Sequence, residues 1–324
     1  MKKTIYGAAL ALLLALTGTA SAATFPDRTL TMVIPFAAGG PTDVLGRIMA
    51  QAMGEILGQT VIVENVGGAG GMTGGKKVAD ARPDGYTMLL GTVGTQAQGQ
   101  TLYAHPLYNA VTDFTPVGLI ADVPIALITR KDLPASNLKE FVAYAKENQA
   151  KMQFGSAGAG SATHLGCVVL NTAMGTNIVH VPYKGTGPAM QDLIAGRIDF
   201  LCEIISTAKP QIDGGTVKAI AIMTKTRSPV EPNLATTVEQ GFDVQAYTWN
   251  ALFLPKGAPE AVVKKLNGAM LAAMKTPAVR SKLEGFGAQV AADDRATPAY
   301  LGEFVKSEIV KWAAPIKASG VQVN

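Results

Sequence analysis

The sequence is poor in charged and aromatic side chains and contains only three histidines. Charged residues make up 16% of the chain and aromatic residues 6%. No basic cluster is interleaved with aromatic residues, so we expect no nucleic acid partner. His105 and His180 have no second ligand at a typical metal-binding spacing, so we expect no metal site. Beyond the first residues, no apolar run is long enough to span a membrane.

Residues 1–22 have the pattern of a removable secretory signal peptide. Lys2 and Lys3 give a positive start, residues 5–16 form a short apolar core, and Ala20-Ser21-Ala22 is a small-residue cleavage site. The apolar core is too short to cross a bilayer. We therefore expect a Sec-type signal peptide, cleavage near Ala22 and a periplasmic location.

Cysteine is rare, because only Cys167 and Cys202 are present. Neither cysteine directly follows the signal peptide, so we expect no lipoprotein anchor. In an oxidising compartment two cysteines can form a disulfide. They can also be two separately buried small residues, and this second interpretation is the one we favour from the sequence.

The rest of the chain is hydrophobic, at 48% of all residues, and strand-like segments alternate with helix-like segments. The first such unit is a β-branched strand at residues 29–34, a loop without charge before Asp43, and a helix with apolar residues at helical spacing. Gly39 and Gly40 let a ligand approach the backbone, and the first helical amides carry partial positive charge. The unit predicts an anion site, although such turns also occur with nothing bound.

A second unit of the same kind occupies residues 152–165, where Ser161 or Thr163 can cap the helix. Alternating strands and helices predict an α/β protein with parallel strands. Apolar strands near Pro124 and Trp249 are expected to cross between two lobes. The two glycine-rich loops would then face each other across a cleft.

Two further segments, residues 67–77 and 93–100, are rich in glycine and in polar residues respectively. Gly70, Gly75 and Lys76 have the spacing of a nucleotide-binding P-loop, but Lys77 stands where Mg²⁺ binding needs Ser or Thr. We therefore expect residues 67–77 to be a glycine-rich loop without a nucleotide, and we expect no cofactor. Residues 93–100 are polar, so we expect a solvated surface loop or, alternatively, amides that face a ligand.

Several motifs occur in the order of a known family, at residues 25–28, 35–43, 63–65, 83–86, 113–116, 155–165 and 181–185. This pattern covers nearly the whole mature chain. It resembles the Bug family of periplasmic solute-binding proteins, the receptors of tripartite tricarboxylate transporters. The resemblance implies a two-lobe type II periplasmic-binding-protein fold with a central ligand cleft. We expect lobe 1 to comprise residues 23–123 and 249–324, and lobe 2 residues 124–248.

In this family a carboxylate is held by backbone amides, hydroxyl groups and ordered waters from the two loops. The resemblance implies ligand-binding roles for Ala38, Gly39, Gly40, Thr42, Asp43, Thr92, Ser156, Gly160, Ser161, Thr163, His164, Tyr183 and Lys184. Phe36 is expected to lie in the core or to stack on an aromatic acid. Glu203 stands where the family often has Asp, and Gln96 where it often has His, so both bear on the distal end of the ligand.

These features predict a binding protein that captures a small organic acid, a dicarboxylate or an aromatic carboxylate. It would deliver the acid, as a monomer, to the membrane subunits of a tripartite tricarboxylate transporter. One alternative is an exported hydrolase using Ser161 and His164, but Ala159 and Thr163 stand where a nucleophile elbow needs glycine. A second alternative is a sensor protein that presents the ligand. We expect no enzymatic activity.

Overall fold

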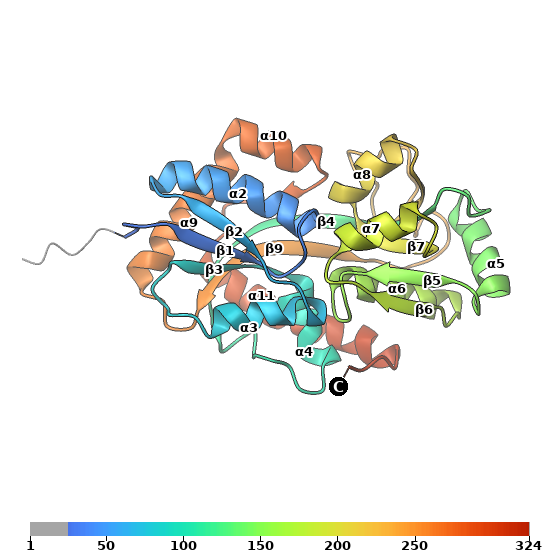
Figure 1. Ribbon diagram of the computed structural model, residues 1–324, viewed down its shortest axis with the longest axis horizontal. Coiled ribbons are helices and arrows are strands. Elements are labelled where there is room, and N and C mark those ends of the chain that lie inside the picture. The colour runs from blue at the N-terminus through green and yellow to red at the C-terminus, as the bar shows by residue number, and fades with distance from the viewer. Residues whose placement is uncertain (1–24, 324) are drawn as a thin grey trace, which may run out of the picture.

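The computed structural model describes residues 25–323, so the predicted signal peptide lies outside the described part. A mixed, curled sheet runs through the molecule in the strand order β2-β1-β3-β9-β4-β7-β5-β6 (Figure 1). In that order the strands are Val61–Asn65, Leu30–Ile34, Thr87–Thr92, Tyr247–Pro255, Phe114–Arg130, Phe200–Ile204, Gln153–Ser156 and Val179–Pro182. Two short strands, β8 (Val217–Ile222) and β10 (Gln289–Val290), also pair with β4.

The sheet has two halves that share the long strand β4. In the first half β1 pairs in parallel with β2 and β3, and β9 joins β3 to β4 by antiparallel pairing. In the second half β5 pairs in parallel with β6 and β7, and β7 runs antiparallel to β4. We call the part around β1, β2 and β3 the first lobe and the part around β5, β6 and β7 the second lobe. The predicted two-lobe α/β fold is thus confirmed, with β4 and β9 as the connecting strands.

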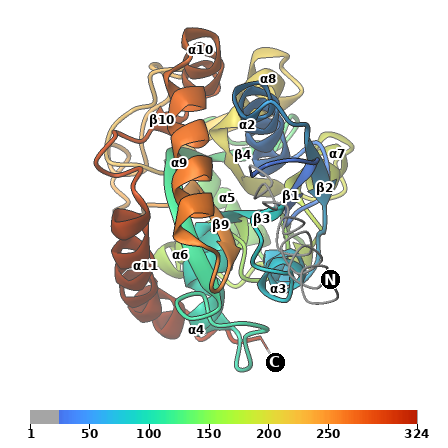
Figure 2. The same ribbon diagram turned by 90° about the vertical axis from the view of Figure 1, so that its left-hand side faces the viewer.

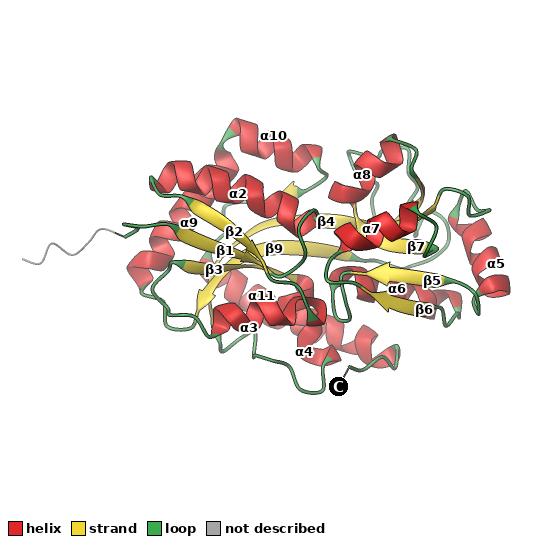
Figure 3. Ribbon diagram, in the orientation of Figure 1, coloured by secondary structure: helices red, strands yellow, loops and turns green. Residues whose placement is uncertain are grey.

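Helices cover both faces of each half of the sheet (Figure 3). In the first lobe they are α2 (Pro41–Leu57), α3 (Met72–Ala79), α4 (Gly99–Leu102), α9 (Glu260–Lys275), α10 (Pro277–Gly285) and α11 (Pro298–Ala318). Figure 2 shows α9 beside α2 at the end of this lobe. In the second lobe they are α5 (Leu138–Asn148), α6 (Ala162–Met174), α7 (Thr186–Ile194) and α8 (Ile205–Asp213). In the described part of the chain, no helix is long and apolar enough to cross a membrane.

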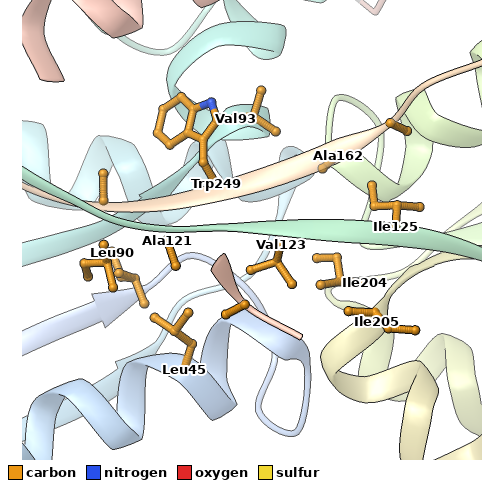
Figure 4. Packing of buried hydrophobic residues seen from close by; sticks show 14 of the residues in the cluster. Leu45, Leu90, Val93, Ala121, Val123, Ile125, Ala162, Ile204, Ile205 and Trp249 are labelled. Atoms are coloured by element: carbon orange, nitrogen blue, oxygen red, sulfur yellow. The ribbon is translucent and has the colours of Figure 1, made fainter. Parts of the chain in front are cut away.

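The core consists of apolar side chains on both sides of the two connecting strands. Leu45 of α2 and Val123 of β4 lie on one side, and Trp249 of β9 lies on the other with Val93 (Figure 4). Most of the periodic apolar residues of α2 are buried, although Ile56 is exposed, and Gly58 ends the helix in the left-handed conformation at φ 70°. The helix predicted after residue 43 therefore forms as expected, and it begins slightly earlier, at Pro41.

Two segments differ from their predicted structure, and two helices were missed. Residues 72–79 form helix α3 instead of a loop, and residues 94–102 form a short π-helix, η2 (Gly94–Gln98), followed by α4. The latter segment is buried, with Gln96 and Gln98 fully shielded from solvent, so it is not a solvated surface loop. Helices α8 and α10 were not predicted at all.

The two cysteines are bonded to each other, which corrects the prediction of separate burial. Cys167 on α6 and Cys202 on β7 form a disulfide, with their Cα atoms 5.4 Å apart. The bond fastens α6 to the sheet of the second lobe. Because α6 begins at the glycine-rich loop of that lobe, the disulfide also anchors the loop.

Candidate functional site

A nearly closed cavity lies between the two lobes. Its free volume is about 20 Å³, which is enough for one or two ordered waters. The lining residues come from both lobes and from the connecting strand β9: Phe36, Gly40, Pro41, Thr42, Thr92, Ala157, Ser161, Ala162, Thr163, Thr186, Ile204 and Thr248. Six of the predicted ligand-binding residues are therefore at the cavity: Phe36, Gly40, Thr42, Thr92, Ser161 and Thr163.

The first lobe contributes the start of helix α2. Gly40 is the N-cap residue and no side chain caps this end of the helix. Because Pro41 has no N–H group, the next amides, those of Thr42 and Asp43, are the helix's free donors at the cavity. These amides carry the positive end of the helix dipole.

Asp43 stabilises this helix start and has no free carboxylate oxygen for a ligand. Its Oδ2 accepts hydrogen bonds from Gly39 N and Arg47 Nε, both at 3.0 Å, and its Oδ1 accepts one from Asn65 Nδ2 at 2.9 Å. Burial acts to raise the pKa of Asp43, but these hydrogen bonds outweigh it and hold the pKa below its usual value. The carboxylate therefore fixes the loop from Phe36 to Gly40.

The second lobe contributes the start of helix α6. The Ser161 hydroxyl accepts a hydrogen bond from His164 N at 3.2 Å and donates one to Gly158 O at 2.7 Å, so it caps the helix and closes the loop. Thr163 Oγ1 accepts a hydrogen bond from Ala157 N at 3.0 Å. The amides of Ala162 and Thr163 remain beside the cavity as donors.

The same lobe contributes a third helix start that sequence reasoning placed too late. The sequence predicts a turn at residues 182–188 and a helix at residues 189–195. Helix α7 instead begins at Thr186, and Gly185 is its N-cap without a side-chain cap. A Cβ atom at Gly40 would lie 3.7 Å from Thr186 Oγ1, so the starts of α2 and α7 approach each other to van der Waals distance, and both residues line the cavity. Figure 1 shows the two helices beginning near each other. The signal that was missed is Gly185 followed by Thr186 and, two residues later, Pro188, a residue tolerated in a first helical turn.

The cavity combines apolar side chains such as Phe36 and Ile204 with uncharged polar ones. None of its lining residues is Asp, Glu, Lys, Arg or His. Its polar side chains are all hydroxyls: Thr42, Thr92, Ser161, Thr163, Thr186 and Thr248. Thr248 was not predicted, although it precedes the buried Trp249 and so faces the opposite side of strand β9. Three helix starts and these hydroxyls together form an environment suited to an anion.

Glu203 lies directly behind the cavity wall and is fully buried. Its Oε1 accepts hydrogen bonds from Thr186 Oγ1 at 3.0 Å and from Thr207 Oγ1 at 2.6 Å, while its Oε2 has no partner. Burial raises the pKa of Glu203 to about 7, against the opposing effect of these hydrogen bonds. Thr186 is thus the link between this carboxyl group and the cavity.

The other predicted residues do not line the cavity. Ala38 and Gly39 are exposed, and the Lys184 side chain points to solvent. The Lys184 carbonyl accepts a hydrogen bond from Ala37 N at 2.9 Å, which joins the two lobes. Tyr183 donates a hydrogen bond to Asp192 Oδ2 at 2.7 Å, away from the cavity.

Ser156, Gly160 and His164 support the second loop from behind. His164 Nδ1 accepts a hydrogen bond from Gly160 N at 3.2 Å, and Ser156 Oγ lies 2.6 Å from His180 Nε2. Burial lowers the pKa of His164 to about 3, with a further contribution from His180, and it lowers the pKa of His180 to about 4. Both rings are therefore neutral near pH 7 and act as hydrogen-bonding supports.

The described residues contain no group of three His, Cys, Asp or Glu side chains placed to hold a metal ion. Ser161 and His164 do not form a nucleophile–base pair, because Ser161 Oγ bonds to the backbone nitrogen of His164 and the ring nitrogen Nδ1 bonds to Gly160. Gln96 is fully buried away from the lining, with both amide atoms unpaired.

Two α/β lobes joined by long strands, with an anion-suited cavity between them, define the class of two-lobe periplasmic binding proteins. The profile of the family "Tripartite tricarboxylate transporter family receptor" (TctC) matches residues 45–321. The chain belongs to this family of solute-binding proteins. A curated relative from Agrobacterium vitis, described as a UPF0065 protein in the TAR-I ttuE-ttuC' intergenic region, is 42% identical over 91% of this chain and 86% of its own length.

Solved structures agree with this assignment. The structure of the periplasmic binding protein BugD has a TM-score of 0.89 and 41% identity, covering 92% of this chain and 99% of its own. MatC from Rhodopseudomonas palustris, solved with bound malate, has a TM-score of 0.88 and 38% identity, covering 90% and 100%. R. palustris Rpa4515, solved with adipate, has a TM-score of 0.87 and 32% identity, covering 92% and 99%.

Proposed function

We propose that this protein binds a small organic carboxylate in the cavity between its lobes and delivers it to the membrane subunits of a tripartite tricarboxylate transporter. The observation that carries the proposal is the meeting of three helix starts at a cavity lined by hydroxyls and no charged side chain. Malate and adipate bound to structural neighbours support a dicarboxylate. An aromatic carboxylate, stacked on Phe36, is the other class we propose.

The binding energy does not require a fixed cation. Hydrogen bonds to a charged group contribute roughly 1.5 to 3 kcal/mol each. About four to six of them, less the cost of immobilising a ligand, reach the roughly 8 kcal/mol of a micromolar complex. We propose that the donors are the amides of Thr42, Ala162 and Thr163 and the hydroxyl of Thr42 at the cavity wall, with the amide of Asp43 next to Thr42 in the first turn of α2.

The two lobes contact each other directly through two hydrogen bonds, from Ala37 N to Lys184 O and from Tyr103 Oη to Ala159 O, both at 2.9 Å. A cavity of about 20 Å³ has no room for a four-carbon acid, so we propose that the lobes open by a hinge to admit it. We place the hinge where the paired strands β4 and β9 pass from one lobe to the other. Residues 23–123 and 249–324 would then lie on one side of the hinge and residues 124–248 on the other.

The hydrolase alternative lacks a reactive pair, because the Ser161 hydroxyl donates its proton to Gly158 O and not to an imidazole. A sensor that presents the ligand to another protein would use the same cavity and differ only in its partner. Location in the periplasm is part of the proposal, in accord with the family and with the signal-peptide pattern.

The first test is a thermal-shift screen of the mature protein against C4 to C6 dicarboxylates, tricarboxylates, amino-acid dicarboxylates and aromatic carboxylates. We expect at least one acid to raise the melting temperature in a saturable way, since a ligand at 100 times its Kd adds about 2.7 kcal/mol of stability. Release of product from the ethyl esters of the same acids would instead support a hydrolase. A screen in which no acid shifts the melting temperature would contradict the proposed function.

A further inference from the structure

Thr186 differs from the other hydroxyl residues of the cavity because a buried carboxyl group stands behind it. The Thr186 side chain lines the cavity and is 3% exposed. Its hydroxyl lies 3.0 Å from Glu203 Oε1. Glu203 does not reach the cavity itself, so a ligand would meet this carboxyl group only through Thr186.

The hydrogen bond to Glu203 decides which role the Thr186 hydroxyl can play toward a ligand. Thr207 also directs its hydroxyl to the same Oε1 atom, at 2.6 Å. While Glu203 is ionised, both of its oxygens can only accept, so Thr186 donates to Oε1. A threonine hydroxyl has one hydrogen, and therefore Thr186 offers the cavity only its oxygen lone pairs.

The helix amides at the cavity are donors, because those that begin α2 and α6 can only donate. Within the described part of the chain, the Thr42 hydroxyl makes no hydrogen bond to a protein acceptor, whereas the Ser161 hydroxyl already donates to Gly158 O. A carboxylate oxygen placed against Thr186 would meet another acceptor. It would have to turn the hydroxyl away from Glu203, which would leave that buried oxygen with one donor fewer. A ligand group that donates a hydrogen bond meets no such conflict.

We propose that the cavity selects carboxylates that also carry a hydrogen-bond donor, a hydroxyl or an ammonium group, and that the Thr186 oxygen accepts from this donor. The inference rests on the proposed carboxylate-binding function and narrows its ligand class to hydroxy acids and amino acids. Thr186 is then the residue that sets specificity, and Glu203 is the residue that fixes the orientation of its hydroxyl.

Calorimetric titration with succinate, malate and aspartate tests the donor requirement, because the three acids share a four-carbon dicarboxylate frame. We expect malate or aspartate to bind at least tenfold more tightly than succinate, which is the size of one well-made hydrogen bond. In Thr186→Val, which has a similar volume, this ratio should fall to about one. In Thr186→Ser, which keeps the hydroxyl, the ratio should be retained.

Two further variants separate the possible explanations. Thr248→Val removes a cavity hydroxyl that has no carboxyl group behind it, so it should leave the affinity ratio of the three acids unchanged. Glu203→Gln keeps an oxygen that can accept from Thr186 but removes the negative charge. It should therefore retain the preference for malate and reduce the preference for aspartate, which identifies whether the donor is a hydroxyl or an ammonium group.

Equal affinities for the three acids in the wild type, or a preference that persists in Thr186→Val, would overturn the inference and leave carboxylate binding intact. The inference would also be overturned if the tightest acid in the thermal-shift screen lacks a hydrogen-bond donor and binds better than its own hydroxy and amino derivatives. If no acid binds at all, the proposed function itself fails, and the two failures are thereby distinguished.

Discussion

The side chains around the cavity are of two kinds: some face the cavity, and others hold the loops around it in place. Asp43, His164 and His180 carry ionisable groups, but each is hydrogen-bonded to a loop and none lines the cavity. The motif residues therefore lie in the predicted loops, and only part of them line the cavity. Side-chain direction depends on partners such as Arg47 and Asn65, which lie outside the loop motif and cannot be inferred from it.

The buried carboxyl group of Glu203 predicts a pH dependence of stability. Its pKa is raised from 4.5 to about 7 in the folded protein, so between these values the folded state holds a proton that the unfolded state has lost. Stability should therefore fall as pH rises through this interval, by about 3 kcal/mol in total, because one pKa unit corresponds to about 1.4 kcal/mol. Glu203→Gln should lack this loss and be more stable than the wild type at pH 8.

Urea unfolding of ligand-free protein at pH 5 and pH 8 measures this effect as the difference between Glu203→Gln and the wild type. The histidines cancel in that comparison because both proteins contain them. Glu147→Gln, at an exposed position of α5, is the matched control and should leave the pH dependence unchanged. A constant stability difference between the two pH values would show that Glu203 is not the group responsible.

At the scale of elements, the site depends on three helices that begin at one place. Two of them, α2 and α6, were predictable, because each follows a strand and a glycine-rich loop and continues with apolar residues at helical spacing. Helix α7 was only partly predicted, since its first turn contains Gly187 and Pro188 and has the composition of a loop. Strand β9 was predicted, but not that Thr248 faces the cavity.

The missed helices have physical explanations. Helix α3 contains Gly74 and Gly75, which have low helix propensity. A Cβ at Gly74 would lie 2.8 Å from Pro35 Cα and one at Gly75 2.4 Å from Tyr108 Cε1, so these glycines permit close packing of the helix. Residues 94–98 are polar and yet buried, so a rule that places polar segments at the surface fails there. The disulfide depends on tertiary proximity, which spacing in the sequence does not reveal.

Gly40 is the residue at which the junction of α2 and α7 can be tested. Its φ of −86° is accessible to other residues, and a Cβ atom would have only ordinary contacts with Ala37 O, Thr186 Oγ1 and Gly187 N. A longer side chain in Gly40→Leu should fill the gap between the lobes and lower carboxylate affinity on the order of 100-fold, about 2.7 kcal/mol. The fold should lose at most about 1 kcal/mol, the cost of a poorer N-cap.

Calorimetry with the best acid and urea unfolding measure these two quantities separately. Gly268→Leu on α9 is the matched control, because it makes the same change at an exposed glycine with open space around it. It should retain full affinity. If Gly40→Leu also retained full affinity, the ligand could not occupy the space between α2 and α7.

For the molecule as a whole, the sequence was sufficient to predict two lobes, two crossings and opposing loops, because these depend on periodic apolar patterns. It could not predict how the lobes contact each other, which depends on distant backbone atoms such as Ala37 N and Lys184 O. The crossing strand β9 is held by the buried Glu308 of α11, which accepts hydrogen bonds from Trp249 Nε1 at 3.1 Å and Tyr247 Oη at 2.8 Å. These bonds attach strand β9 to the first lobe.

The central claim is that helix starts and hydroxyls, without a charged side chain, hold a carboxylate between the two lobes. The most direct measurement is a calorimetric titration with the tightest acid from the thermal-shift screen and with the amide in which its bound carboxylate is replaced. We predict one site per protein, micromolar or tighter affinity for the acid, and binding at least 100-fold weaker for the amide, since charge-assisted hydrogen bonds are about twice as strong as neutral ones. Equal affinity for the acid and the amide would contradict the claim.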